Sequence, residues 1–218
     1  MLIDEELIAQ ITREIMRQIN VQETVELNEG ISQKERINET KTSYIGYPRA
    51  NKGTNPKEVV IGVGAAFQRE IKKTINGLDL DDVLDNIKAG IEEEGMIPRV
   101  VKVLNTSDVC FMGLEAAKLS GSGIGVGIQS KGTTVIHQKD LYPLSNLELF
   151  PQAPLMELET YRKIGKNAAK YVKGEQVVPV PCTNDPMSRP KYQAKAAIMH
   201  IVETEQLDPA IGIIEWEG

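Results

Sequence analysis

Three short apolar runs alternate with two helical patterns between residues 58 and 128, and this alternation restricts the fold more than any other feature. Strands are predicted at residues 59–64, 99–104 and 123–128. The helices between them show apolar stripes at Val83, Leu84, Ile87 and Ile91, and at Val109, Met112, Ala116 and Leu119. Strand–helix–strand order implies right-handed crossovers and a parallel sheet covered on both faces. The predicted fold class is α/β, a Rossmann-like parallel sheet flanked by helices.

Residues 121–138, GSGIGVGIQSKGTTVIHQ, join a glycine-interrupted strand to a polar turn. Glycine lets a backbone approach a ligand closely, Lys131 brings a positive charge, and Thr133 brings a hydroxyl. Such a set suits a phosphate or a cofactor rimmed with amides. The lysine precedes the second glycine of the phosphate-binding-loop spacing, and no window fits G-x-G-x-x-G. A glycine-rich buried strand with a polar turn therefore stays open as an alternative.

The expected ligand edge follows from the topology. In open α/β sheets, ligands bind beyond the carboxyl ends of the strands. Residues 62–67, 105–108 and 129–133 each follow or end a predicted strand. The three segments are therefore expected to meet at one edge of the sheet, where the glycine-rich turn also lies.

The compact domain is predicted at residues 58–206, with extensions on both sides. Residues 1–20 read as an amphipathic helix, and residues 21–57 as a flexible linker or arm of polar residues with little periodicity. Such a helix is expected to dock on something outside its own domain, although folding back onto the domain is an alternative. Residues 207–218 form a C-terminal tail to which the sequence assigns no role.

The second half of the domain is less regular. Prolines bracket an apolar stretch at residues 143–154, which is expected to line a ligand, a subunit contact or simply its own domain. A helix that stops near Gly174 is predicted from the apolar stripe of Leu155, Leu158, Tyr161, Ile164 and Ala168. A basic patch at residues 189–195 leads into a final helix or strand at residues 196–202.

Composition excludes several classes of function. The net charge of −6 argues against nucleic acid as a partner, because phosphate backbones require clustered cations. No apolar run approaches membrane-spanning length, and the start of the chain lacks the pattern of a secretory signal. Isolated Cys110, Cys182, His137 and His200 do not make a metal site. Because no catalytic set is recognisable, the residues indicate a cytoplasmic binding subunit whose catalytic groups lie on another chain.

Long, irregular segments carry a resemblance to a known family. They include the stretch GIQSKGTTVIHQ at 127–138 and the stretch PLSNLELF at 143–150, and shorter ones lie at 91–95, 107–109, 119–124, 152–154, 158–161, 164–169 and 189–191. Across roughly residues 58–202 the chain closely resembles the medium (β) subunit of adenosylcobalamin-dependent propanediol (diol) and glycerol dehydratases.

This resemblance implies a lyase made of large, medium and small subunits, a heterohexamer with two copies of each. The cobalt cofactor, adenosylcobalamin, would lie between this chain and the large subunit. A potassium or calcium ion and the radical conversion of propane-1,2-diol or glycerol to an aldehyde and water would belong to the large subunit. The chain lacks the Asp-x-His-x-x-Gly motif that replaces the cofactor's own base on cobalt, so base-on binding is expected.

Carried over position by position, the family's cobalamin contacts fall on Asp108, Lys131, Thr133, Leu144, Asn146, Pro151 and Arg189. The resemblance implies that the two cations meet the nucleotide-tail phosphate or the side-chain amides, and that Asp108 accepts from amide N–H groups. Leu144 and Pro151 would pack against the dimethylbenzimidazole. These residues are expected to share one concave surface.

The N-terminal helix resembles the signals that load propanediol-degrading enzymes into bacterial microcompartments. Residues 1–20 are therefore expected to bind shell proteins, and the assembled enzyme to bind a reactivating factor. The main alternative is the small subunit of a dehydratase-reactivating factor, a chaperone that shares this fold and lacks the cobalamin-facing loops. A general Rossmann nucleotide-binding module is a third possibility, disfavoured by the missing fingerprint.

Overall fold

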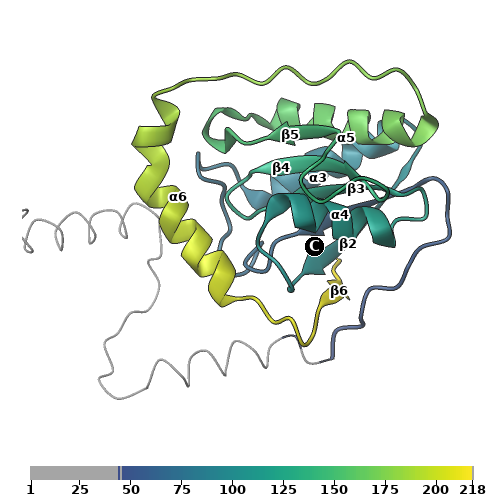
Figure 1. Cartoon of the computed structure of the whole chain (residues 1–218). Helices are drawn as coiled ribbons and strands as arrows, with labels where there is room; N and C mark the ends of the chain where they lie inside the picture. The colour runs from purple at the N-terminus through teal and green to yellow at the C-terminus, as the bar shows by residue number, and fades with distance from the viewer. Residues whose placement is uncertain (1–43, 45, 218) are drawn as a thin grey trace, which may run out of the picture.

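A computed structural model describes residue 44 and residues 46–217. Its centre is a sheet in the order β5-β4-β3-β1-β2-β6 (Figure 1). The strands are β1 (Glu58–Val63), β2 (Ile97–Val103), β3 (Ile124–Ile128), β4 (Thr134–Gln138), β5 (Glu148–Phe150) and β6 (Ile213–Glu215). The predicted helix at 1–20 and most of the predicted linker lie outside the described residues. No helix within the described part is both long and apolar enough to cross a membrane.

The three predicted strands are confirmed as β1, β2 and β3, and they pair in parallel. The outer part of the sheet adds antiparallel strands to this predicted parallel centre, because β4, β5 and β6 all pair antiparallel. For β4 the physical reason is connection length: residues 129–133 join β3 to β4, and a parallel crossover needs a dozen residues or more. The fold class remains α/β, with a mixed sheet.

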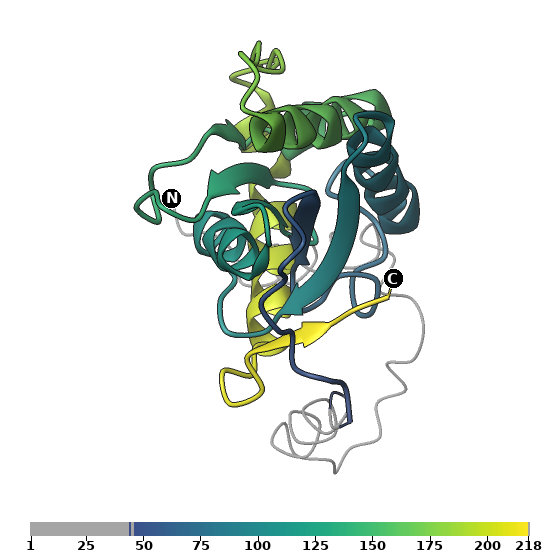
Figure 2. The same cartoon turned by 90° about the vertical axis from the view of Figure 1, so that its right-hand side faces the viewer.

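The helices cover both faces of the sheet, as Figure 2 shows. From β1 the chain crosses to β2 on one side and then returns past β1 to β3. Right-handed connections in opposite directions put their helices on opposite faces. Accordingly α4 (Val109–Leu119) covers one face, and α3 (Leu80–Glu93) packs with α5 (Leu158–Lys173) on the other. The direction reverses between β1 and β3, so this gap is the topological switch point of the sheet.

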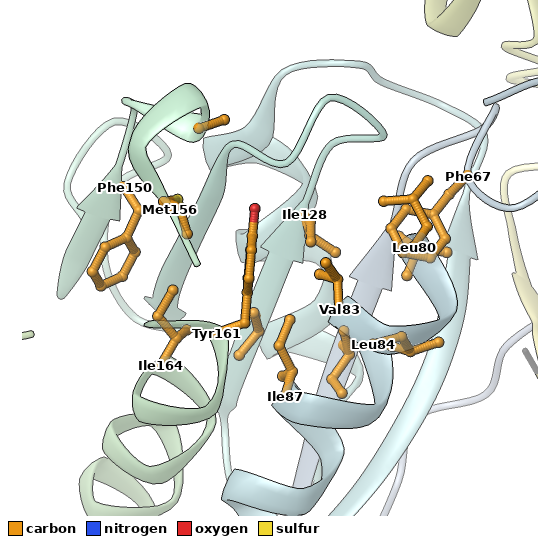
Figure 3. Packing of buried hydrophobic residues seen from close by; sticks show 14 of the residues in the cluster. Phe67, Leu80, Val83, Leu84, Ile87, Ile128, Phe150, Met156, Tyr161 and Ile164 are labelled. Carbon is orange, nitrogen blue, oxygen red and sulfur yellow. The ribbon is translucent and has the colours of Figure 1, made fainter. Parts of the chain in front are cut away.

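The main core lies between the sheet and the α3–α5 layer. Figure 3 shows Tyr161 of α5 standing beside Ile87 of α3 and Ile128 of β3. All three side chains are fully buried. The two helices approach unusually closely, because a Cβ added at Gly90 would lie 2.1 Å from the carbonyl oxygen of Arg162. A Cβ at Gly165 would likewise lie 2.2 Å from the carbonyl oxygen of Ile87. Two glycines therefore allow backbone-to-backbone contact at this crossing.

The packed unit extends beyond the predicted bounds of 58–206. Within the predicted tail, β6 pairs with β2 and Ile214 is fully buried. Within the predicted linker, the amide of Ala50 donates to the carbonyl of Ile213 (2.9 Å), and the Tyr44 hydroxyl donates to Ala65 (2.8 Å). These contacts join segments distant in the sequence, and β6 is too short to produce an alternating pattern. The predicted final helix or strand at 196–202 lies inside a longer helix, α6 (Ser188–Glu205), which also contains the basic patch.

Candidate functional site

A pocket of about 450 Å³ opens at the carboxyl end of the sheet, between the β3–β4 turn, the segment after β5 and the first half of α6. Figure 1 shows α6 running along the side of the domain. The described lining residues are Ile75, Lys131, Thr133, Pro151, Gln152, Ala153, Pro154, Ser188, Arg189, Tyr192, Gln193 and Ala196. The set contains two cations, several hydroxyls and amides, and no acidic side chain, so the pocket suits an anionic or amide-rich group.

Backbone hydrogen bonds fix the β3–β4 turn that brings Lys131 and Thr133 into the pocket. The Gln129 amide donates to Thr133 (3.0 Å), and the Gly132 amide donates back to Gln129 (2.8 Å). Gly132 has a φ of +104°, a conformation that side chains disfavour. Next to the turn, the amide of Ile75 donates to the Lys131 carbonyl (3.0 Å). The glycine turn expected from the sequence is therefore present and closely held.

Tyr161 supports this turn from behind, and sequence analysis assigned it only to a helix stripe. Its hydroxyl donates to the carbonyl of Gly132 (2.9 Å), which also accepts from the Thr134 hydroxyl (2.9 Å). Burial raises the pKa of Tyr161, which keeps the hydroxyl protonated and able to donate. No local pattern marks this role, because the two residues are joined only in the folded chain.

Tyr161→Phe is expected to lower the free energy of unfolding by about 1 kcal/mol, the usual net value of one hydrogen bond. The loss should stay that small because Thr134 still donates to the same carbonyl. Urea unfolding of the full chain measures it. Tyr142→Phe, at an 83% exposed tyrosine, is the control and should change nothing. Equal stability of the Tyr161 variant and the wild type would show that the hydroxyl does not hold the turn.

The two cations of the pocket differ in their surroundings. Lys131 is half-buried, and burial lowers its pKa, while the negative charge of Glu203 opposes this shift. Arg189 is exposed, near the N-terminus of α6. The start of that helix is tied to the pocket wall, because the Ser188 hydroxyl donates to the side chain of Gln152 (2.7 Å). The two cations therefore face the pocket from different elements.

Asp108 lies at the same edge of the sheet but does not line the pocket. Its carboxylate caps α4 by accepting from the amides of Cys110 (2.8 Å) and Phe111 (3.2 Å). The segment that carries it is tied to the β3–β4 turn, since Gln129 donates to the carbonyl of Ser107 (2.6 Å). The three segments expected at the carboxyl edge therefore do meet there. Asp108 does accept from amide N–H groups, but they belong to its own helix.

Leu144 and Asn146 lie at the opposite edge of the sheet. Because β4 runs antiparallel to β3, it carries the chain away from the pocket, and Gln138 at its end pairs with the first residue of β3. The β4–β5 loop lies there, roughly 13 Å of strand from the turn. Leu144 is 75% exposed. Of the seven predicted contact residues, Lys131, Thr133, Pro151 and Arg189 thus lie around this pocket, and Asp108, Leu144 and Asn146 do not line it.

A second charged cluster lies behind the pocket. Lys102 of β2 is fully buried; it donates to the carbonyl of Phe67 (2.7 Å) and its amine lies 3.7 Å from the ring centre of Trp216. Burial lowers its pKa to about 7. Glu203 of α6 is 3% exposed, and burial raises its pKa to about 7. Sequence analysis missed both residues, because nothing local distinguishes them from surface charges.

Fold and pocket together define an α/β protein with a cationic pocket at the carboxyl ends of its strands. Residues 64–178, more than half of the chain, match the model of the dehydratase medium subunit family. The chain belongs to that family, whose members are subunits of larger dehydratases.

Two solved structures are also similar to this chain. One, described as a glycerol dehydratase reactivase, is 16% identical and covers 63% of this chain and 97% of its own, with a TM-score of 0.42. The other is a diol dehydratase-reactivating factor complexed with ADP and Mg²⁺. It is 21% identical and covers 56% of this chain and 96% of its own, with a TM-score of 0.41. At these scores the likenesses carry no weight for function.

Proposed function

We propose that this chain is the medium subunit of an adenosylcobalamin-dependent diol dehydratase and forms one side of the cobalamin site. The observation that carries the proposal is the pocket: four of the seven residues implied by the family resemblance line it. The family match supports the medium subunit over the small subunit of a reactivating factor. The substrates would be propane-1,2-diol and glycerol.

The pocket residues fit part of such a cofactor. Cobalamin has an outer rim of amides and one phosphate, and the pocket offers two cations, the Thr133 hydroxyl and the amides of Gln152 and Gln193. The half-buried Lys131 is partly stripped of water, which strengthens its attraction for an anion. Lys131 and Arg189 would hold the phosphate or amide oxygens from two sides, and Pro151 would pack against an apolar ring.

The cofactor is larger than this pocket, so a second chain would complete its site. The large subunit would supply that surface together with the diol, the metal ion and the catalytic groups. When bound, the cofactor supplies the radical chemistry that removes a hydrogen from the diol. The residues of this chain would bind and orient the cofactor. Leu144 and Asn146 would join the same site only if cofactor or partner reached past β4 and β5.

The wider assembly is part of the same proposal: a heterohexamer within a cytoplasmic bacterial microcompartment, served by a reactivating factor. Shell proteins would bind residues 1–20, which lie outside the described residues. The family name supports association with other dehydratase subunits.

Lys131→Ala and Arg189→Ala are each expected to weaken cobalamin binding by about 10- to 100-fold, since a hydrogen bond to a charged group is worth about 1.5–3 kcal/mol. The measurement is cobalamin titration of the complex co-expressed with the large and small subunits. Lys139→Ala, at an exposed lysine beyond β4, is the matched control. Wild-type affinity in both pocket variants would refute the proposed site, and a wild-type complex that retains no cobalamin would refute the function.

A further inference from the structure

Helix α6 is anchored by few residues, and one of them is charged. Of its eighteen residues, only Ser188, Met199 and Glu203 are buried. The Glu203 carboxylate lies directly against the end of β1, since a Cβ added at Gly64 would lie 1.5 Å from its Oε1. Gly64 itself is bonded to the end of β3, where its amide donates to Ile128 (3.0 Å). Glu203 therefore fills the switch point between β1 and β3.

Cations and polar groups from several elements face this carboxylate. Lys102 comes from β2, Lys131 from the β3–β4 turn and Tyr44 from the arm before β1. The hydroxyl and amide of Ser130 are near enough to oppose the rise in the pKa of Glu203. They are not aligned with it, however, and Ser130 Oγ and Glu203 Oε1 are the described buried side-chain oxygens without a hydrogen-bond partner. The Oε1 atom of Glu203 therefore lies at the strand ends without a hydrogen bond, near the positive charges of Lys102 and Lys131.

The other half of the same helix forms a wall of the pocket. Arg189, Tyr192, Gln193 and Ala196 of α6 line it, opposite Lys131 and Thr133. A helix is nearly rigid, and Arg189 lies roughly 20 Å along the axis from Glu203 at 1.5 Å per residue. A change in how Glu203 sits at the strand ends would therefore tilt the wall and move Arg189 relative to Lys131.

We propose that Glu203 is a positioning residue: its carboxylate seats α6 on the ends of β1 and β3 and so sets the pocket's width. Its negative charge also stabilises the protonated, positively charged form of Lys131. The inference concerns the geometry of the pocket, and it rests on the proposed function only for the identity of the ligand.

Gly64→Ala tests the contact of the Glu203 carboxylate with the strand ends without changing any charge. The added methyl would occupy the place of the carboxylate, and Glu203 can swing away because it is the end of a flexible side chain. Gly53→Ala is the matched control, since its Cβ would lie 1.9 Å from Glu58 Oε2, also a carboxylate but one at the amino edge of the sheet. Glu203→Gln keeps the shape of the side chain and removes the charge.

The first measurement is hydrogen–deuterium exchange of the full chain, read from peptides of α6, α3 and α4. We expect roughly tenfold faster exchange in α6 for Gly64→Ala, with α3 and α4 unchanged, because local opening would be confined to α6. Gly53→Ala should leave α6 as in the wild type. Unchanged exchange in α6, or an equal rise in all three helices, would overturn the proposal.

The second measurement is the rate at which an amine-reactive acylating reagent modifies Lys131 as pH is varied. Glu203→Gln should shift the midpoint of this profile to lower pH, because the supporting negative charge is gone. If the role of Glu203 were purely structural, the midpoint would stay in place. An unchanged midpoint would therefore count against the inference. If α6 loosens and the midpoint shifts, yet Lys131→Ala binds cobalamin as tightly as the wild type, the inference stands and the proposed function fails.

Discussion

A chain that ends at Gly212 is expected to lose about 4 kcal/mol of its free energy of unfolding. The truncation removes β6 with the fully buried Ile214, and removal of such a side chain alone costs about 2–5 kcal/mol. It also removes Trp216, which covers the buried amine of Lys102, and Glu215, which accepts from Arg99 Nε (3.1 Å). Exposing Lys102 to water offsets part of the loss, because its charged form is then solvated.

Urea unfolding of the full and truncated chains measures this effect. A chain that ends at Trp216 keeps β6 and is the control. Glu217 is exposed, so this shorter truncation should leave the urea midpoint unchanged. If the chain ending at Gly212 were as stable as the wild type, β6 and its ladder with β2 would contribute nothing to the folded domain.

Gly90→Ala is expected to destabilise the protein by about 2 kcal/mol, in the range of overpacked cores. Helix propensity alone predicts the opposite sign, because alanine is favoured over glycine by about 1 kcal/mol inside a helix. The added methyl would meet the backbone of Arg162 and Lys166, which cannot swing away as a side chain can. The two helices would have to move apart at this crossing, which weakens the packing between α3 and α5.

Thermal or urea unfolding shows whether Gly90→Ala lowers or raises the free energy of unfolding. Asp85→Ala, at an exposed position of the same helix, changes propensity without a steric conflict and should stay within about 0.5 kcal/mol of the wild type. A Gly90→Ala variant that is more stable than the wild type would show that the crossing has room for a methyl group.

Local patterns predicted the central part of the fold well. Apolar runs and helical stripes identified β1, α3, β2, α4 and β3 in order, because each element buries a continuous face of its own. The outer strands were harder. The direction of β4 depends on a five-residue connection, and β5 and β6 have three residues each, too few for a periodic signal.

The site was predicted in part for a similar reason. Lys131 and Thr133 stand in a recognisable glycine turn that ends a predicted strand, so their edge of the sheet followed from topology. Tyr161 and Glu203 reach the same turn from α5 and α6, and their roles depend on long-range contacts. The family resemblance placed Leu144 and Asn146 in one concavity with Lys131, but the antiparallel β4 carries them to the other edge.

The order of apolar and glycine residues by itself determined that a three-stranded parallel centre would form with a polar turn at its carboxyl edge. Those features depend on period and on connection length, which can be read along the chain. Only the tertiary structure decided what surrounds that edge: a wall made by α6, a carboxylate at the switch point and a sheet closed by the last residues. Such contacts join residues far apart in the sequence. They bury charged residues such as Lys102 and Glu203, which look like surface residues in the sequence, and burial changes the pKa of each.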